Sequence, residues 1–332
     1  NSSGQRNGRV MNRILVKRYL HDAKWLWLSC ALILFSYCWL RVWMVTLFNM
    51  SRFEKVLEQF KHLEKFSSVP FAELATYTGR IAIAFDEPIV ITSIVIWAVA
   101  RASDSISGEL GRGTMELLLA QPISRTRLFW SHASMTILGL GLLALITFLG
   151  TWVGIATCQV TETLPPATIQ LPLLDIEIPN PLAKSEEVLR PMSELVSVWH
   201  FLPAVTILFC LGFFLAGLTC LVSCWDRYRW RTIGIMIGFY VIQLIFKIAG
   251  MATEDLGWLL HFTFFTAYEP KVFVNVALRS PELLSELFQF NDDGQYVRPG
   301  VLGSHLLLLV LGSCCFFTAT VIFRRRDLPA PI

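Results

Sequence analysis

The residues whose types and spacing could do chemistry are concentrated in one short polar stretch of the chain. It covers residues 103–127 and reads SDSISGELGRGTMELLLAQPISRTR. Gly111 and Gly113 permit a tight turn, since glycine adopts backbone angles that are closed to other residues. The hydroxyl of Thr114 can then accept from a free backbone N–H at the start of a helix. The stretch therefore predicts a turn that leads into a capped helix.

That helix is expected over Met115–Ala120. Glu116 suits its first turn, where free N–H groups favour a negative charge, and Pro122 ends it because proline cannot continue the hydrogen-bond ladder. Its apolar residues would lie where water is expected, which indicates docking on a partner protein or on a membrane surface. Packing beneath the chain's own helices is the alternative. The apolar residues concerned are Met115, Leu117, Leu118 and Leu119.

Several kinds of enzyme chemistry lack the residues they need. The chain has no Gly-Lys pair and no HExxH sequence, which excludes a Walker P-loop and a zinc protease of that type. Ser304 and His305 are adjacent along the chain rather than placed to face each other across a site. The eight cysteines form no CxxC pair and lie in or beside apolar stretches, which favours core packing over metal binding. We therefore expect no enzyme activity, and no cofactor or metal held by this chain.

Composition indicates that a membrane is the main solvent of the chain. Hydrophobic residues make up 54% of the sequence and charged residues 16%, whereas charged residues make up about a quarter of an ordinary soluble domain. A membrane span needs about 20 mostly apolar residues. We expect an all-α integral membrane protein with about six transmembrane helices. The expected spans are Trp25–Phe48, Pro88–Ala102 with an outward extension at Ile81–Phe85, Leu128–Thr157, Phe201–Cys224, Ile233–Met251 and Val301–Phe323.

Positive charge lies mainly on one side of these spans. The side that carries both termini holds sixteen arginines and lysines against six carboxylates, and each of its four segments agrees. Because cytoplasmic loops carry the excess of lysine and arginine, both termini are expected in the cytoplasm. The formal net charge is only +3, and no long basic run could follow a phosphate backbone, so nucleic acid is not an expected partner.

The chain divides into a short N-terminal segment and one transmembrane domain. Residues 1–24 are expected to be cytoplasmic, with Met11 as a candidate natural start. Basic and apolar residues alternate there, as in an amphipathic elbow helix on the inner leaflet, although an ordinary positively charged flank would look the same. Residues 25–332 form the membrane domain, with residues 103–127 as its main cytoplasmic segment.

Three external loops are expected, over residues 49–80, 158–200 and 252–300. The first contains a helical period of apolar residues over Ser51–Phe66, which predicts an amphipathic helix. The prolines of Thr161–Pro191 predict an extended loop with some strand-like character. The third loop should begin with a short re-entrant or interfacial helix over Leu256–Tyr268, too short to cross, and contain another short helix around Pro281–Phe288.

Charged and polar residues within the spans are candidates for a translocation pathway. Arg41 lies in the outer half of the first span, where a central arginine costs about 2.5 to 3.5 kcal/mol on insertion scales. Asp86 and Glu87 are its expected ion-pair partners, and a substrate contact is the alternative. Gln243 and Lys247 share one face of the fifth span, so they are expected to line the pathway, unless Lys247 only reaches outward to the headgroups.

The polar stretch resembles the signature of type-2 ABC transporter permeases. The matching pieces are SGE at 107–109, RGT at 112–114, ELLL at 116–119 and QPISR at 121–125, and Gly111 is a mild departure from the family pattern. The resemblance implies that the Met115–Ala120 helix is a coupling helix, which docks in a cleft of a separate ABC ATPase subunit that binds ATP and Mg²⁺. It also implies a second permease copy, identical or paralogous. The implied coupling residues are Glu109, Gly113, Thr114, Glu116, Leu117, Leu118 and Pro122.

The resemblance leads to a function hypothesis and leaves one alternative open. We expect the permease subunit of an ATP-driven exporter in the inner (plasma) membrane of a bacterial cell, with an unidentified substrate. The alternative is a non-transporting membrane anchor or assembly factor, whose large charged and proline-rich external loops bind an extracytoplasmic partner.

Overall fold

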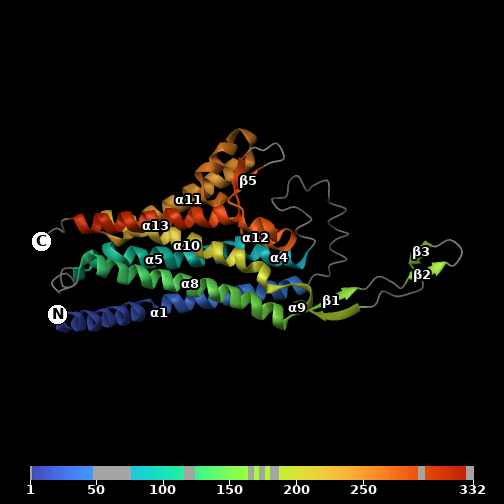
Figure 1. Ribbon diagram of the computed structural model, residues 1–332, viewed down its shortest axis with the longest axis horizontal. Helices are drawn as coiled ribbons and strands as arrows, with labels where there is room; N and C mark the ends of the chain where they lie inside the picture. Colours follow the sequence, from blue (N-terminus) through green and yellow to red (C-terminus); the bar gives the residue numbers. More distant parts are fainter. Residues whose placement is uncertain are drawn as a thin grey trace.

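The computed structural model shows an elongated bundle of helices that run roughly along its long axis (Figure 1). Helix α1 begins and helix α13 ends at the same end of this bundle, which we call the inner end; the opposite end is the outer end. The structure describes residues 2–47, 76–115, 124–163, 168–171, 176–179, 187–290 and 296–326.

Six of the described helices are long and apolar enough to cross a membrane, so the predicted fold class and all six predicted spans are confirmed. The second span is the longest, because α5 continues at both ends into shorter helical turns and the whole covers Tyr77–Gly111. The six helices are α1 (Ser2–Thr46), α5 (Pro88–Ser103), α8 (Arg125–Thr157), α10 (Leu202–Trp225), α11 (Arg229–Ala252) and α13 (Val301–Arg325).

Helix α10 lies at the centre of the bundle and is the most buried of the six spans. It packs against α5, α8, α11 and α13. Its contact with α13 is close because glycines meet there: a Cβ atom added to Gly217 would lie 2.6 Å from the carbonyl oxygen of Gly312. Small residues at such crossings let two backbones approach, which is how helices pack in lipid.

Helix α1 packs along α8 through a second pair of glycines. Gly150 and Gly154 are four residues apart on α8 and face α1. An added Cβ at Gly150 would lie 2.7 Å from the carbonyl oxygen of Phe35, and one at Gly154 would lie 2.8 Å from the Cβ of Val42. This G-x-x-x-G pair therefore fixes the α1–α8 contact.

The outer end of the second span is covered by a helix that the sequence reasoning did not predict. The predicted extension at Ile81–Phe85 is present as α4 (Tyr77–Ala82) and the 3₁₀ turn η2 (Ile83–Asp86). Helix α12 (Pro270–Arg279) packs on both. Just before α12, the buried Tyr268 hydroxyl donates to the carbonyl oxygen of Phe85 at 2.7 Å.

The second external loop forms a β-ribbon that projects beyond the outer end (Figure 1). Strand β1 (Gln159–Thr163) pairs antiparallel with β4 (Glu187–Pro191), and β2 (Thr168–Leu171) pairs antiparallel with β3 (Ile176–Pro179). The short helices α9 (Met192–Leu195) and η4 (Val198–Phe201) then return the chain to α10. The predicted strand-like character of this loop is confirmed.

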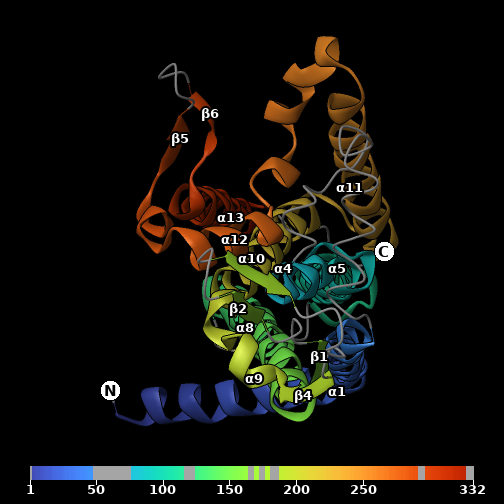
Figure 2. The ribbon, with the colours of Figure 1, turned by 90° about the vertical axis from the view of Figure 1, so that its right-hand side faces the viewer.

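The third external loop begins with short 3₁₀ helices that do not cross the membrane. Helix η5 (Glu254–Phe262) has nine residues, or about 18 Å at 2 Å per residue, against a hydrocarbon core of about 30 Å. It packs back along α11, where Gly250 lies against Leu260, and η6 (Phe264–Thr266) follows (Figure 2). The predicted short segment before the last span is therefore present.

The helix predicted around Pro281–Phe288 is shorter than expected. It is the 3₁₀ helix η7, which ends at Ser285. Phe288 instead begins strand β5 (Phe288–Phe290), where it pairs with Pro299 of β6 (Tyr296–Pro299). Antiparallel pairing with the next strand thus replaces the local helical pattern.

Two helices were predicted for the first part of the chain, an elbow helix within residues 1–24 and an amphipathic helix over Ser51–Phe66. Helix α1 runs without a break from Ser2 into the first span, and Figure 2 shows its N-terminal part directed away from the bundle. The side chains that would make an elbow amphipathic lie outside the described residues, as does the predicted helix Ser51–Phe66.

Candidate functional site

The candidate site forms where α5 widens into a π turn at the inner end of the bundle. The turn, η3, covers Asp104–Gly108, and one further helical turn, α6 (Glu109–Gly111), follows it. A π turn inserts an extra residue into a helix and is found most often at functional positions. All five residues of η3 are buried, so its polar side chains need partners inside the protein.

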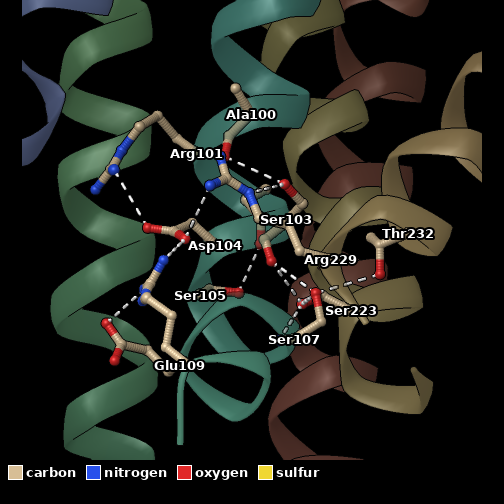
Figure 3. Close-up of polar contacts among 12 residues, drawn as sticks. Ala100, Arg101, Ser103, Asp104, Ser105, Ser107, Glu109, Ser223, Arg229 and Thr232 are labelled. Carbon is tan, nitrogen blue, oxygen red and sulfur yellow. Dashed lines mark hydrogen bonds and ion pairs between the residues drawn. The ribbon is translucent and has the colours of Figure 1, made fainter. Parts of the chain in front are cut away.

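Asp104 binds three arginines that come from three parts of the chain (Figure 3). Its Oδ1 lies 2.7 Å from Nη1 of Arg112 and 3.3 Å from Nη1 of Arg229, and its Oδ2 lies 3.6 Å from Nη1 of Arg101. Arg101 is buried, whereas the side chains of Arg112 and Arg229 are 42% and 41% exposed. The carboxylate therefore joins the end of α5, the turn after α6 and the start of α11.

Glu109 completes this charged cluster, which consists of Arg101, Asp104, Glu109, Arg112 and Arg229. The buried Glu109 carboxylate lies 3.1 Å from Nη2 of Arg112. It also accepts a hydrogen bond from the Thr114 hydroxyl. Burial opposes the charge of Arg112, but the hydrogen bond that it donates to Asp104 and the charges of both carboxylates raise its pKa above the usual value. The cluster holds three positive charges and two negative ones.

Arg229 ties α11 to the backbone of α5 as well as to Asp104. Its Nη2 donates to the carbonyl oxygen of Ala100 at 3.0 Å, and its Nε donates to the Ser103 hydroxyl at 3.4 Å. The π turn displaces backbone donors from their regular acceptors, and the N–H of Asp104 is directed to the carbonyls of Arg101 and Ala102. An arginine with five donors can bind both the carboxylate and a carbonyl at such a point.

A hydroxyl cluster of Ser103, Ser107, Ser223 and Thr232 lies beside the charged cluster (Figure 3). Ser223 of α10 donates to the Ser107 hydroxyl at 3.0 Å and accepts from the Ser107 backbone N–H at 2.9 Å. Ser107 in turn donates to the carbonyl oxygen of Ser103 at 2.7 Å, and Thr232 of α11 donates to Ser107 at 3.3 Å. These bonds join the π turn to both α10 and α11.

Gly108 is required by the position of Asp104. A Cβ atom added to Gly108 would lie 2.3 Å from Oδ1 of Asp104, which is far inside ordinary contact distance. Oδ1 is the atom that Arg112 and Arg229 share. The glycine of the SGE piece thus leaves room for the carboxylate at the centre of the charged cluster.

Gly113 makes the sharp turn that the sequence predicted. Its φ is +69°, in the left-handed region that glycine adopts without strain. The predicted cap by Thr114 has a different form, because its hydroxyl proton binds back to Glu109. Met115 does not face water as expected: it is 1% exposed and belongs to the apolar core. For this residue the alternative of packing beneath its own helices is correct, because the turn at Gly113 directs it toward the bundle.

The remaining predicted coupling residues lie outside the described part of the chain. They are Glu116, Leu117, Leu118 and Pro122. The structure resumes at Ser124, whose side chain accepts from the backbone N–H of Arg127 and caps α8. Arg125 donates to the carbonyl oxygen of Arg326 at 2.6 Å, and Arg326 donates to that of Cys224. The inner ends of α8, α10 and α13 are joined in this way.

Arg41 does not form the predicted ion pair. Its side chain is partly buried on α1, and no ion pair with Asp86 or Glu87 is present among the described residues. Its Nε is buried without a hydrogen-bond partner there. The role of Arg41 as a pathway residue stays a prediction.

Gln243 and Lys247 share one face of α11, as predicted, but this face contacts their own chain. The buried Gln243 side chain accepts from the backbone N–H of Phe264 at 3.1 Å, and the backbone carbonyl oxygen of Gln243 accepts from the Thr263 hydroxyl at 3.0 Å. The Lys247 ammonium lies 5.4 Å from the centre of the Phe265 ring. Both residues hold the η5–η6 junction against α11.

The sequence reasoning missed most partners of the coupling segment. Arg101, Asp104 and Arg229 were counted only as charges that set the orientation, and Ser223 and Thr232 received no role. Arg101 and Asp104 are three residues apart, so their pairing on one helical face could have been found from spacing alone. Arg229 and Ser223 are more than a hundred residues away from their partners, and no local pattern indicates the contact.

Comparison with known proteins gives one finding on the family. Residues 21–328, nearly the whole chain, match the family model described as ABC-2 family transporter protein. The matched range contains all six spans and both polar clusters. A search of curated proteins found no match.

Proposed function

Because the chain belongs to the ABC-2 family of transporter proteins, we propose that it is the permease of a type-2 ABC transporter that exports a substrate. A separate ABC ATPase subunit binds ATP and Mg²⁺ and supplies the energy. The inner end of the bundle faces the cytoplasm in this proposal, as the distribution of lysine and arginine indicates, and the membrane is the bacterial plasma membrane.

The observation that carries the proposal is the charged cluster at the end of the second span. A force on residues 116–123, applied by the ATPase, reaches Arg112 and Glu109 through the Gly113 turn. Arg112 binds Asp104 at 2.7 Å, and Asp104 binds Arg229 of α11 at 3.3 Å. The adjacent hydroxyl cluster adds α10 through Ser223. Movement of residues 116–123 is thereby passed to α5, α10 and α11 together.

We further propose that the ion pairs of the charged cluster take two arrangements, as a conformational switch requires. Arg112 is half exposed and binds both Asp104 and Glu109. A shift of residues 116–123 can therefore move Arg112 from Asp104 to Glu109, since Arg101 and Arg229 still neutralise Asp104. ATP binding then favours one arrangement and its release favours the other, because a ligand shifts an equilibrium by its difference in affinity for the two states.

A second permease copy is the other proposed partner, and it contacts α11. This helix is the least buried of the six spans. It carries Gly234 and Gly238 four residues apart, and a Cβ added to either would meet nothing within 4 Å among the described residues. The equivalent spacing at Gly150 and Gly154 is filled by α1. G-x-x-x-G pairs in spans are preferred sites of helix association, so the open pair supports a dimer contact.

Copurification with the ATPase subunit tests the function. We expect an ABC ATPase encoded beside this chain to copurify with the tagged permease, and Leu118→Asp to abolish this because it places a charge on the coupling helix. Leu189→Asp is the matched control: Leu189 is an exposed leucine of β4 on the other side of the membrane. Retained copurification with Leu118→Asp would contradict the assignment of this helix.

The external ribbon favours a second candidate function, a non-transporting anchor for an extracytoplasmic partner. Strands β1 to β4 extend beyond the outer end of the bundle (Figure 1). Two-stranded ribbons are marginally stable alone in water, so a partner that covers this one would stabilise it. An external pull-down of a partner, together with ATPase activity that no candidate solute changes, would favour the anchor over the exporter.

A further inference from the structure

A lateral cavity between α1, α5 and α8 lies beside the charged cluster and shares Arg101 with it. Its volume is about 310 Å³, which is the lower end of the range for small-ligand pockets. The walls are almost wholly apolar. At its rim, Leu28 of α1 and Leu138 and Leu142 of α8 are about half exposed, at 49%, 57% and 42%. Because these residues lie in membrane spans, the cavity opens toward lipid.

Two tryptophans form the floor of the lateral cavity and leave no free donor in it. The indole N–H of Trp27 donates to the carbonyl oxygen of Gly139 at 3.2 Å, and that of Trp97 donates to the carbonyl oxygen of Thr136 at 3.1 Å. A Cβ added to Gly139 would lie 2.3 Å from Trp97, so this ring lies directly against the α8 backbone at Gly139. The polar atoms of both rings are used by α8, and the surfaces that remain are aromatic carbon suited to hydrocarbon.

Two cations lie on the wall of the same cavity. Arg101 contributes from α5 and Lys24 from α1, near the inner start of the first span. The Lys24 ammonium lies within 3.2 Å of the His21 ring nitrogen. Arg101 belongs to the charged cluster, which carries three arginines against two carboxylates and so has one surplus positive charge. An apolar groove with positive charge at one end complements an amphiphile with one hydrocarbon chain inside and an anionic head at Lys24.

From this complementarity we propose that the lateral cavity binds an acyl chain of an anionic phospholipid from the inner leaflet. Lys24 lies at the depth of the headgroups and holds the phosphate, since lysine extends its charge to the interface. The lipid also contacts Arg101, which pairs with Asp104. Lipid binding at this cavity requires neither the ATPase nor export. Only the choice of the inner leaflet rests on the proposed orientation.

Native mass spectrometry of the purified full-length chain tests the site. The chain is titrated with phosphatidylglycerol and with phosphatidylcholine of the same acyl composition. We expect one phosphatidylglycerol to be retained about fivefold more strongly than phosphatidylcholine, the preference expected of one lysine near the interface. Lys24→Gln should remove this preference and leave phosphatidylcholine binding unchanged, and Lys24→Arg should restore it.

A pair of tryptophan variants tests the cavity itself. Leu142→Trp fills the cavity and should abolish retention of both lipids. Leu145→Trp is the matched control, because Leu145 is 49% exposed on the same helix but does not line the cavity. Both positions face lipid, so neither change should unfold the protein, and equal melting temperatures verify this. Equal retention of the two lipids by the unchanged chain, or equal retention by the two tryptophan variants, would overturn the proposal.

Discussion

Gly108→Ala should destabilise the protein by displacing Asp104, although alanine suits the backbone at this position. Gly108 has φ −67° and ψ −47°, which are ordinary helical angles, so the change by itself would stabilise a helix by about 0.5–1 kcal/mol. The added methyl, however, would lie 2.3 Å from Oδ1 of Asp104, and ordinary contact begins near 3.4 Å. The carboxylate must therefore recede by about 1 Å from the arginines that share this oxygen.

The expected net effect follows from these two terms. Overpacking a buried site costs about 1–3 kcal/mol, and the helix gain offsets about 0.5–1 kcal/mol of this, so the free energy of unfolding should fall by roughly 1 kcal/mol. Gly111→Ala is the matched control, three residues further along the same segment, because its added Cβ would only reach ordinary contact with the carbonyl oxygen of Arg227 at 3.6 Å. That variant should be as stable as the unchanged protein or slightly more stable.

Thermal unfolding in detergent, followed by circular dichroism, measures the difference. A loss of 1 kcal/mol lowers the melting temperature by about 1–2 °C in a chain of 332 residues, because the entropy of unfolding grows with chain length. A double-mutant cycle tests the cause, since the clash disappears when Asp104 is alanine. Gly108→Ala should then cost nothing in an Asp104→Ala background. The reasoning is refuted if Gly108→Ala melts no lower than Gly111→Ala, or if its cost persists without Asp104.

Two further predictions concern glycines at other positions. Gly113→Ala should lower the free energy of unfolding by about 1–2 kcal/mol, because φ is +69°, and Gly113→Asn should lower it less. Denaturation in SDS measures both variants, and equal effects of the two would argue against a left-handed turn. Gly238→Leu should weaken self-association of the purified chain, and the control Gly141→Leu on α8 should not, because an added Cβ there lies 3.8 Å from Phe209. Analytical ultracentrifugation in detergent compares the two variants, and a dimer that Gly238→Leu leaves unchanged would exclude this face of α11 as the contact.

The spans could be predicted from sequence because each depends on local composition. A run of about 20 apolar residues must cross the bilayer wherever its neighbours lie. The turn at Gly113 was equally local, since two glycines separated by one residue indicate a sharp bend. Helix α12 was missed because its burial depends on α4 and η2, almost two hundred residues earlier in the chain.

Most partners in the candidate site could not be predicted for the same physical reason, although the three-residue spacing of Arg101 and Asp104 is a local pattern. Glu109 was chosen from a motif, but its bonds to Arg112 and Thr114 need the three-dimensional turn. Arg229 was expected to mark the cytoplasmic side, and the structure places it on Asp104 at 3.3 Å. Met115 was expected at the surface because a short isolated helix has no visible neighbours in the sequence, whereas the bundle buries it.

The π turn also sets the rotational phase of everything that follows it. Each residue of an α-helix turns the chain by about 100° and advances it by about 1.5 Å. Deleting one residue between Asp104 and Gly108 would restore a regular helix and rotate Glu109 and the Gly113 bend by about that angle. The single extra residue thus sets the angle about the α5 axis at which the chain after Gly113 continues.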